Sequence, residues 1–160
     1  MNKVLDVKVV AMNAMIATVY AVLTIVCASI SYGAINLRIS EIIVFLAFFN
    51  RKYIPGLIVG CFLANLASPM GIYDVVFGTI ATILVCVAMY RLKNLYLAAI
   101  AGGVINGIIV GAELYWVLDL PFMINVFYVF VGETIVLIIG AILFQLLQKN
   151  TIFMKKYIIE

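Results

Sequence analysis

The stretch from Asn94 to Asp119, NLYLAAIAGGVINGIIVGAELYWVLD, decides how this chain folds. It is long and apolar enough to cross a bilayer as a helix, for which about 20 residues are needed. Three glycines recur in it at every fourth position, namely Gly103, Gly107 and Gly111. Small residues at that spacing form a smooth stripe, which lets a neighbouring backbone approach closely in lipid. The stretch therefore predicts a tightly packed membrane helix.

Two polar residues lie beside the glycine stripe. Asn106 and Glu113 are seven residues apart, which is about two helical turns, so they share one face of the helix. An amide and a carboxylate at membrane depth are costly unless they meet partners or a polar ligand. A closely packed backbone beside such a pair is what a membrane-embedded binding site for a small polar molecule requires.

The composition extends this interpretation to the whole chain. The 160 residues are 68% hydrophobic and 11% charged, with a mean hydropathy of +1.28. So few charges could not coat a soluble domain of this size. The apolar runs lack the alternation of barrel strands. We therefore expect an all-α integral membrane protein whose residues 1–160 form one domain.

The residue types that are missing exclude several classes of function. The chain has no histidine, which removes most zinc sites and every catalytic triad that uses histidine. It also has no Gly-rich phosphate loop of the ATPase type. Its three cysteines, Cys27, Cys61 and Cys86, lie in apolar runs and are interpreted as small hydrophobic residues. We expect no catalytic residue, no metal site and no cofactor in this chain.

Six membrane-spanning helices are predicted, at residues 8–29, 38–50, 54–67, 74–90, 95–118 and 121–148. The second and third are short for a perpendicular span. A re-entrant hairpin over residues 38–67 is the alternative. It is disfavoured because its tip would hold Arg51 and Lys52 at mid-bilayer, at a cost of several kcal/mol.

The basic residues predict the orientation. With both termini in the cytoplasm, nine of the ten basic residues fall on the inner side, and only Arg38 falls outside. The nine are Lys3, Lys8, Arg51, Lys52, Arg91, Lys93, Lys149, Lys155 and Lys156.

The acidic residues show the opposite distribution. Glu41, Asp74, Glu113 and Asp119 lie at or near the outer ends of the predicted spans, and Glu133 lies deeper, as does Asn106. The inner halves of the spans are almost purely apolar. This pattern predicts a polar pocket that is open to the outside and closed towards the cytoplasm.

Simpler explanations exist for each of these polar residues. Arg38 and Glu41 could be a local helix pair, and Asp74 could cap its helix. Trp116 could belong to an aromatic belt at the membrane interface. The buried carboxylates and Asn106 could hydrogen-bond to one another.

A ligand interpretation is also specific. A carboxylate accepts two parallel hydrogen bonds from the N–H edge of a guanine-like ring, and aromatic faces stack on a flat heterocycle. The residues therefore favour a small, flat, polar ligand that is neutral or cationic.

Several segments together resemble the QueT family. They are ASISYGAINLRISE at residues 28–41, IPGLIVGCFLANL at 54–66 and YDVVFGTIAT at 73–82, joined by the segments 106–121 and 131–133. The resemblance covers about Val9 to Leu147. It implies a substrate-binding S component of an energy-coupling factor transporter, a class of ABC importer in the bacterial cytoplasmic membrane. Such a protein has six helices and is not itself an enzyme.

The resemblance also implies partners and a substrate class. The substrate would be a queuosine precursor, that is, a 7-cyano- or 7-aminomethyl-7-deazaguanine or queuine. The partners would be a transmembrane coupling subunit and two cytoplasmic ATPases, with no nucleic acid involved. Docking to the coupling subunit is expected at Ala14, Ala17 and Ala21.

The expected substrate-binding residues combine the polar pattern and the resemblance. Glu113 is expected to read the N–H edge with Asn106 beside it, and the first outer loop, residues 30–37, is expected to act as a lid. The full set is Glu113, Asn106, Glu133, Asn65, Asp74, Arg38, Glu41, Trp116, Tyr128 and Tyr32. The alternatives are an S component for another vitamin-like ligand and an autonomous secondary transporter.

Overall fold

The computed structural model describes residues 7–32 and 36–149, and within them it contains helices and no strand. The α-helices are α1 (Val7–Val26), α2 (Ala28–Ser31), α3 (Phe45–Phe49), α4 (Ile54–Asn65), α5 (Ile72–Arg91), α6 (Leu95–Leu118) and α7 (Phe122–Gln148). Two 3₁₀ helices, η1 (Ile39–Val44) and η2 (Arg51–Tyr53), precede α3 and α4. The all-α prediction is confirmed.

The count of six helices differs from the structure, which has seven α-helices in the described ranges. The first predicted span is interrupted at Cys27, whose φ of −96° and ψ of 25° separate α1 from α2. The second predicted span divides into η1 and α3. Apolar composition continues across both breaks, so hydropathy could not reveal them. Only α1, α5, α6 and α7 are long and apolar enough to be candidate membrane spans among the described residues.

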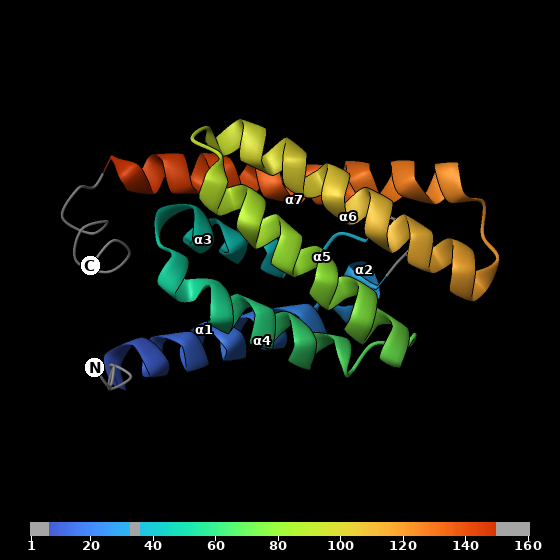
Figure 1. The fold of residues 1–160 in the computed structure, drawn as a ribbon, viewed down its shortest axis with the longest axis horizontal. Coiled ribbons are helices and arrows are strands. Elements are labelled where there is room, and N and C mark those ends of the chain that lie inside the picture. Colours follow the sequence, from blue (N-terminus) through green and yellow to red (C-terminus); the bar gives the residue numbers. More distant parts are fainter. Residues whose placement is uncertain (1–6, 33–35, 150–160) are drawn as a thin grey trace.

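The long helices form a bundle in which chain neighbours are mostly neighbours in space (Figure 1). α7 packs along α6, α6 along α5, α5 along α4, and α4 along α1. η1 and α3 fill the interior, where they contact α1, α5 and α7. The segment between α1 and α4 therefore contributes to the core of the bundle.

The glycine stripe of α6 faces α7. A Cβ atom built on Gly107 would lie 3.0 Å from the Cβ of Phe130 and from the carbonyl oxygen of Val126. One built on Gly111 would lie 3.0 Å from the Cα of Val126, and one on Gly103 would meet Thr134. These glycines let the two helices approach closely, as small residues do in membrane bundles.

A second close contact joins α1 to α4. A Cβ atom on Gly60 would lie 3.0 Å from the Cα of Ala17. Near the start of both helices, Asn13 accepts a hydrogen bond from the backbone N–H of Gly56 at 2.6 Å and donates one to the carbonyl of Lys52 at 2.9 Å. These contacts fix the position of α1 along α4.

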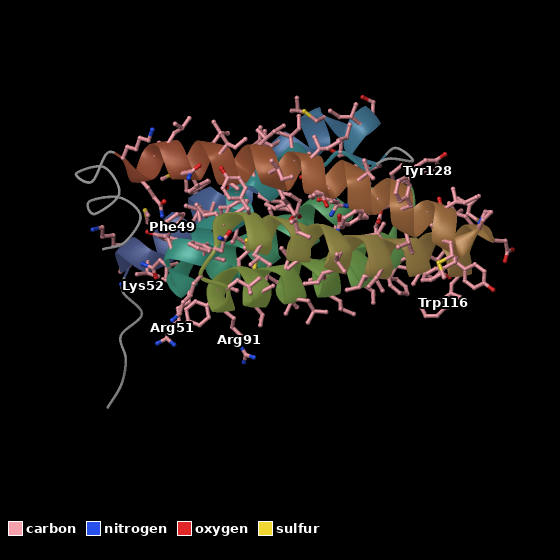
Figure 2. All side chains as sticks on the ribbon, turned by 90° about the horizontal axis from the view of Figure 1, so that it is seen from above. Phe49, Arg51, Lys52, Arg91, Trp116 and Tyr128 are labelled. Carbon is pink, nitrogen blue, oxygen red and sulfur yellow. The ribbon has the colours of Figure 1, made fainter. Side chains whose placement is uncertain are left out.

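The two ends of the bundle differ in character (Figure 2). Arg51, Lys52 and Arg91 lie at one end, and Trp116 and Tyr128 lie towards the other. α1 begins and α7 ends at the basic end (Figure 1). This arrangement agrees with an even number of crossings, and which side of the membrane the basic end faces stays a prediction.

Candidate functional site

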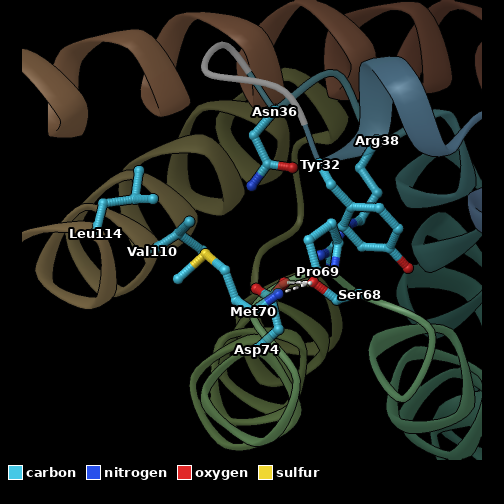
Figure 3. Close-up of a pocket in the computed structure, with 9 residues that line it drawn as sticks. All are labelled: Tyr32, Asn36, Arg38, Ser68, Pro69, Met70, Asp74, Val110 and Leu114. Atoms are coloured by element: carbon cyan, nitrogen blue, oxygen red, sulfur yellow. Dashed lines mark hydrogen bonds between the residues drawn. The ribbon is translucent and has the colours of Figure 1, made fainter. Parts of the chain in front are cut away.

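A small pocket, which we call the loop pocket, lies where the segment after α2 meets the α4–α5 connection and α6 (Figure 3). Its volume is about 50 Å³. Both polar and apolar side chains line it: Tyr32, Asn36, Arg38, Ser68, Pro69, Met70, Asp74, Val110 and Leu114. Of the predicted site residues, Tyr32, Arg38 and Asp74 are therefore brought together.

One wall of the pocket is formed by Tyr32, Asn36 and Arg38, and specific contacts hold it. The Tyr32 hydroxyl donates a hydrogen bond to the carbonyl of Ala64 at 2.6 Å, and burial raises the pKa of this phenol, which keeps it a donor. The Arg38 guanidinium lies over the Tyr32 ring, 5.8 Å from its centroid. Asn36 has a φ of 53°, a left-handed conformation that asparagine tolerates better than most residues.

The opposite wall is built around Asp74 in the first turn of α5. The Ser68 hydroxyl donates a hydrogen bond to the Asp74 carboxylate and accepts one from the backbone N–H of Met70 at 3.2 Å (Figure 3). The Asn65 amide donates to the Asp74 carbonyl at 2.9 Å. Asp74 does not cap α5 as the simpler explanation proposed, because the N-cap residue is Gly71. The Asp74 carboxylate instead lines the pocket.

Glu113 is fully buried behind this pocket. It lies on α6 between Val110 and Leu114, which both line the pocket. Neither of its carboxylate oxygens accepts a hydrogen bond from an N–H or hydroxyl group of the described residues. The carboxyl group of Asp74 is close enough for hydrogen-bond contact with Glu113, and Arg38 lies within electrostatic range of it. Asp74 in the wall of the pocket and Glu113 behind it therefore offer acceptor oxygens that the N–H donors of a ligand would stabilise.

A second set of buried polar residues lies deeper in the bundle, and we call it the core cluster: Tyr20, Arg38, Glu41, Asn106 and Glu133. The hydroxyl of Tyr20 donates a hydrogen bond to the Glu41 carboxylate. Arg38 lies within electrostatic range of Tyr20, Glu41 and Glu133. The predicted site residues Glu41, Asn106 and Glu133 therefore belong to this cluster and not to the lining of the loop pocket.

Mutual hydrogen bonding explains part of the predicted polar set. The Asn106 amide donates to the Glu133 carboxylate at 3.3 Å, which joins α6 to α7. Asn106 is thus engaged with Glu133, whereas Glu113 on the same helix has no such partner. Arg38 lies between the two groups of acids, as it lines the loop pocket and also belongs to the core cluster.

The two remaining aromatic candidates, Trp116 and Tyr128, do not line the loop pocket. Trp116 is 68% exposed and Tyr128 is 46% exposed. Their ring contacts are with Phe77, at 5.9 Å between centroids, and with Phe127, at 6.4 Å. Large exposed aromatic rings at the end of a bundle are typical of a membrane-interface belt.

The rest of the chain covers only part of the predicted docking stripe on α1. Ala17 and Ala21 are buried inside the chain, and Ala14 is exposed. Only Ala14 is therefore available to another subunit in this conformation.

The predicted lid includes residues 33–35, which lie outside the described residues.

Sequence reasoning missed Asn36, Ser68 and Met70 as pocket residues. A usable signal was the Ser-Pro-Met-Gly string at residues 68–71, since these residue types mark a turn that closes over the start of the next helix. Sequence reasoning also interpreted Cys61 as a small hydrophobic residue, whereas its sulfur takes part in hydrogen bonds. The Cys61 sulfur accepts hydrogen bonds from Thr82 at 3.0 Å and from Asn65 at 3.3 Å.

Within the described ranges, no group of three or more Asp, Glu or Cys side chains could hold a metal ion. The arrangement suits recognition of an organic ligand, because it joins carboxylates, a guanidinium, an amide and a phenol ring in one place.

Comparisons with known proteins agree on one family. Residues 10–149 match the family model described as QueT transporter. The chain is 30% identical to the protein named queuosine precursor transporter QueT from Lactococcus lactis subsp. cremoris (strain MG1363), and the similarity covers 86% of this chain and 90% of that one. None of the solved structures matches this chain.

Proposed function

The chain belongs to the QueT transporter family, and from this premise we propose that it is the substrate-capture component of an energy-coupling factor importer for 7-deazaguanine precursors of queuosine. Its four membrane-length helices and its family make it a multi-pass membrane protein. In this proposal the loop pocket faces the outside of the cell and takes the substrate from there. ATP hydrolysis is left to partner subunits.

The observation that carries the proposal is the buried carboxyl group of Glu113, which lies beside the carboxyl group of Asp74 and receives no hydrogen bond from an N–H or hydroxyl group of the described residues. A buried carboxylate that lacks donors costs free energy in the empty protein, so a ligand that supplies donors is favoured. The pyrimidine edge of a 7-deazaguanine offers an N–H and an NH₂ side by side, which is the complement of a carboxylate. We assign Glu113 to this edge, with Asp74 as the second acceptor.

The other wall of the loop pocket supplies the remaining contacts. The buried Nε of Arg38 has no hydrogen-bond partner among the described residues. The side-chain oxygen of Asn36 is also buried and has no such partner. Arg38 can donate to the ring carbonyl of the substrate, and Asn36 can accept a hydrogen bond from a ring N–H. The Tyr32 ring offers a face for stacking.

Substrate entry requires the loop pocket to widen. Its volume of about 50 Å³ holds a few water molecules and not a two-ring heterocycle. Met70 reaches across the pocket towards Val110 in Figure 3, and methionine side chains rearrange easily because they are unbranched. Displacement of Met70 would open the pocket between the α4–α5 connection and α6.

Docking to a coupling subunit is assigned to the free face of α1. Of the four membrane-length helices, α1 buries the smallest share of its residues inside the chain. The exposed Ala14 lies on that face, and a small side chain there permits close helix packing in lipid. Ala17 and Ala21 support docking indirectly, because they position α1 against the rest of the bundle.

The test of the substrate assignment is a calorimetric titration of the purified full chain in detergent. The ligands are 7-cyano-7-deazaguanine, 7-aminomethyl-7-deazaguanine, queuine and guanine, with thiamin, riboflavin and biotin as unrelated compounds. We expect a 7-deazaguanine to bind and Glu113→Ala to abolish the binding while the variant keeps the elution profile and the helical circular dichroism of the parent. Binding of a vitamin instead would overturn the ligand assignment.

The test of the partner assignment is co-purification. Tagged chain expressed with a coupling subunit and two ATPases should retain all three. Ala14→Leu should weaken their retention, because a larger side chain separates the packed helices. Ala67→Leu, at an exposed alanine outside α1, is the matched control. Equal retention by both variants would contradict docking at this face.

A further inference from the structure

A second pocket lies at the basic end of the bundle, and we call it the amide pocket. It is larger than the loop pocket, about 220 Å³, and open to its surroundings. It is formed by the α5–α6 connection, the start of α6, the last turns of α7 and α3. Its lining residues are Phe48, Lys93, Asn94, Leu95, Tyr96, Gln145 and Gln148.

The polar groups of the amide pocket present donors. The Asn94 side-chain oxygen already accepts hydrogen bonds from the backbone N–H groups of Tyr96 at 2.9 Å and of Leu97 at 3.1 Å. The Gln145 side-chain oxygen accepts one from the Tyr96 hydroxyl at 2.7 Å. Because these two oxygens are engaged inside the protein, the groups that the two amides can offer a ligand are their NH₂ donors. Asn94, Gln145 and Lys93, each with an N–H donor, therefore line the same pocket.

The charge of this region favours an anion. The lining includes Lys93 and, among the described residues, no Asp or Glu. Arg91 and Lys149 are exposed close by in sequence, before Lys93 and after Gln148. Convergent amide and ammonium donors without a carboxylate match a phosphate group, which offers several acceptor oxygens and a negative charge.

We propose that the amide pocket binds the phosphate group of an anionic phospholipid. The surroundings favour a lipid as the source of that phosphate over free phosphate. Leu97 and Leu146, which are more than half exposed, lie next in sequence to the pocket residues Tyr96 and Gln145. They offer an apolar surface to acyl chains, and basic pockets between helices at the cytoplasmic surface suit anionic headgroups. The proposal does not depend on the identity of the transported substrate.

The experiment is native mass spectrometry of the purified full chain in a nonionic detergent. The probes are dioleoyl phosphatidylglycerol and dioleoyl phosphatidylcholine, which share their acyl chains and differ in net charge. We expect a one-to-one adduct that prefers phosphatidylglycerol. Lys93→Gln should weaken that adduct about fivefold, the effect of one basic residue near a membrane surface.

Two further variants separate this site from general attraction to the basic end. Tyr96→Phe changes no charge but frees the Gln145 oxygen, so the amide can turn and the adduct should weaken. Lys52→Gln removes the same charge as Lys93→Gln at the same end, outside the pocket, and should leave the adduct unchanged. Equal weakening by the two lysine variants, or no preference for phosphatidylglycerol, would overturn the proposal.

Free phosphate is tested in the same setting. Inorganic phosphate is added against chloride at matched ionic strength. Retention of the phosphatidylglycerol adduct supports the lipid, and its displacement by phosphate alone would overturn the lipid assignment. Thermal unfolding of each variant checks that the fold is intact, and Lys93→Gln is exposed enough to be tolerated.

Discussion

The core cluster and the loop pocket both place carboxylates inside the bundle, and they differ in what those carboxylates contact. In the core cluster, Glu41 accepts a hydrogen bond from Tyr20, and Glu133 accepts one from Asn106. Behind the loop pocket, Glu113 is equally buried but has no donor. A buried carboxylate is therefore not by itself a sign of a ligand site. The sign is a buried carboxylate that lies directly behind a pocket and receives no hydrogen bond from an N–H or hydroxyl group of the protein.

The largest effect should come from Glu113→Gln. The change keeps the shape of the side chain but replaces one acceptor oxygen with an NH₂ group, which would face a donor of the substrate. We expect substrate affinity to fall about 100-fold, which is about 3 kcal/mol, because one hydrogen bond is lost and the other loses its charge assistance. Stability should stay constant or rise, because a buried acid that receives no hydrogen bond from an N–H or hydroxyl group is replaced by a neutral amide. Calorimetry and thermal unfolding in detergent measure the two quantities.

The matched control is Glu133→Gln in the core cluster. Its amide oxygen can still accept the hydrogen bond from Asn106, and Glu133 does not line the loop pocket. Affinity should stay within about threefold of the parent, which is less than 1 kcal/mol. If Glu133→Gln weakened binding more than Glu113→Gln, the roles assigned to the two groups would be reversed.

Tyr20→Phe should lower stability and leave substrate affinity nearly unchanged, which is the opposite of Glu113→Gln. Removal of the hydroxyl leaves the Glu41 carboxylate without its donor, and the other oxygen of Glu41 already lacks a partner. We expect a loss of about 1.5–3 kcal/mol in the free energy of unfolding, with little change in substrate affinity. Denaturation in mixed detergent measures the first and calorimetry the second. Tyr90→Phe, at an exposed tyrosine, is the control.

Gly107→Ala tests whether close packing of α6 against α7, the two helices that carry Asn106 and Glu133, stabilises the fold. A methyl group there would lie 3.0 Å from atoms of Phe130 and Val126, so the helices must separate. We expect a destabilisation of about 1–3 kcal/mol in thermal unfolding. Val104→Ile adds one carbon to the exposed face of the same helix and should have no measurable effect. Equal melting temperatures for both variants would argue against close packing at Gly107.

The smallest effect is expected at the exposed aromatic end. Trp116→Ala should change substrate affinity less than twofold, because Trp116 does not line the loop pocket. Tyr32→Ala removes a pocket ring and should weaken binding up to about tenfold, the range of an aromatic contact of 0.5–1.5 kcal/mol. Calorimetry on the two variants compares them directly. A greater loss at Trp116 would place the substrate at that surface instead.

Runs of apolar residues in the sequence predicted the helix bounds well where the helix is continuous. The predicted helix over residues 95–118 coincides with α6, and the glycine stripe within it does form the contact with α7. The first span was predicted as one helix because apolar residues continue through Cys27. The break at that position depends on backbone geometry and on the packing of α2, which hydropathy does not register.

The candidate site was only partly accessible to sequence reasoning. Asp74 and Glu113 were identified because charge is costly inside an apolar helix. Their proximity, and the pairing of Asn106 with Glu133, depend on how α5 and α7 are rotated about their axes relative to α6. Asn36, Ser68 and Met70 lie on connections, where no helical period indicates which way a side chain points.

The sequence by itself determined that this is a helical membrane protein and that a few polar residues lie within its apolar helices. Both follow from the cost of leaving backbone and charged groups without partners in hydrocarbon. The tertiary structure decided which acid has a partner, which aromatic rings line a pocket and which alanines of α1 are already buried. A helix that is apolar on every side has no face that marks the protein interior, so its rotation is set only by packing against its neighbours.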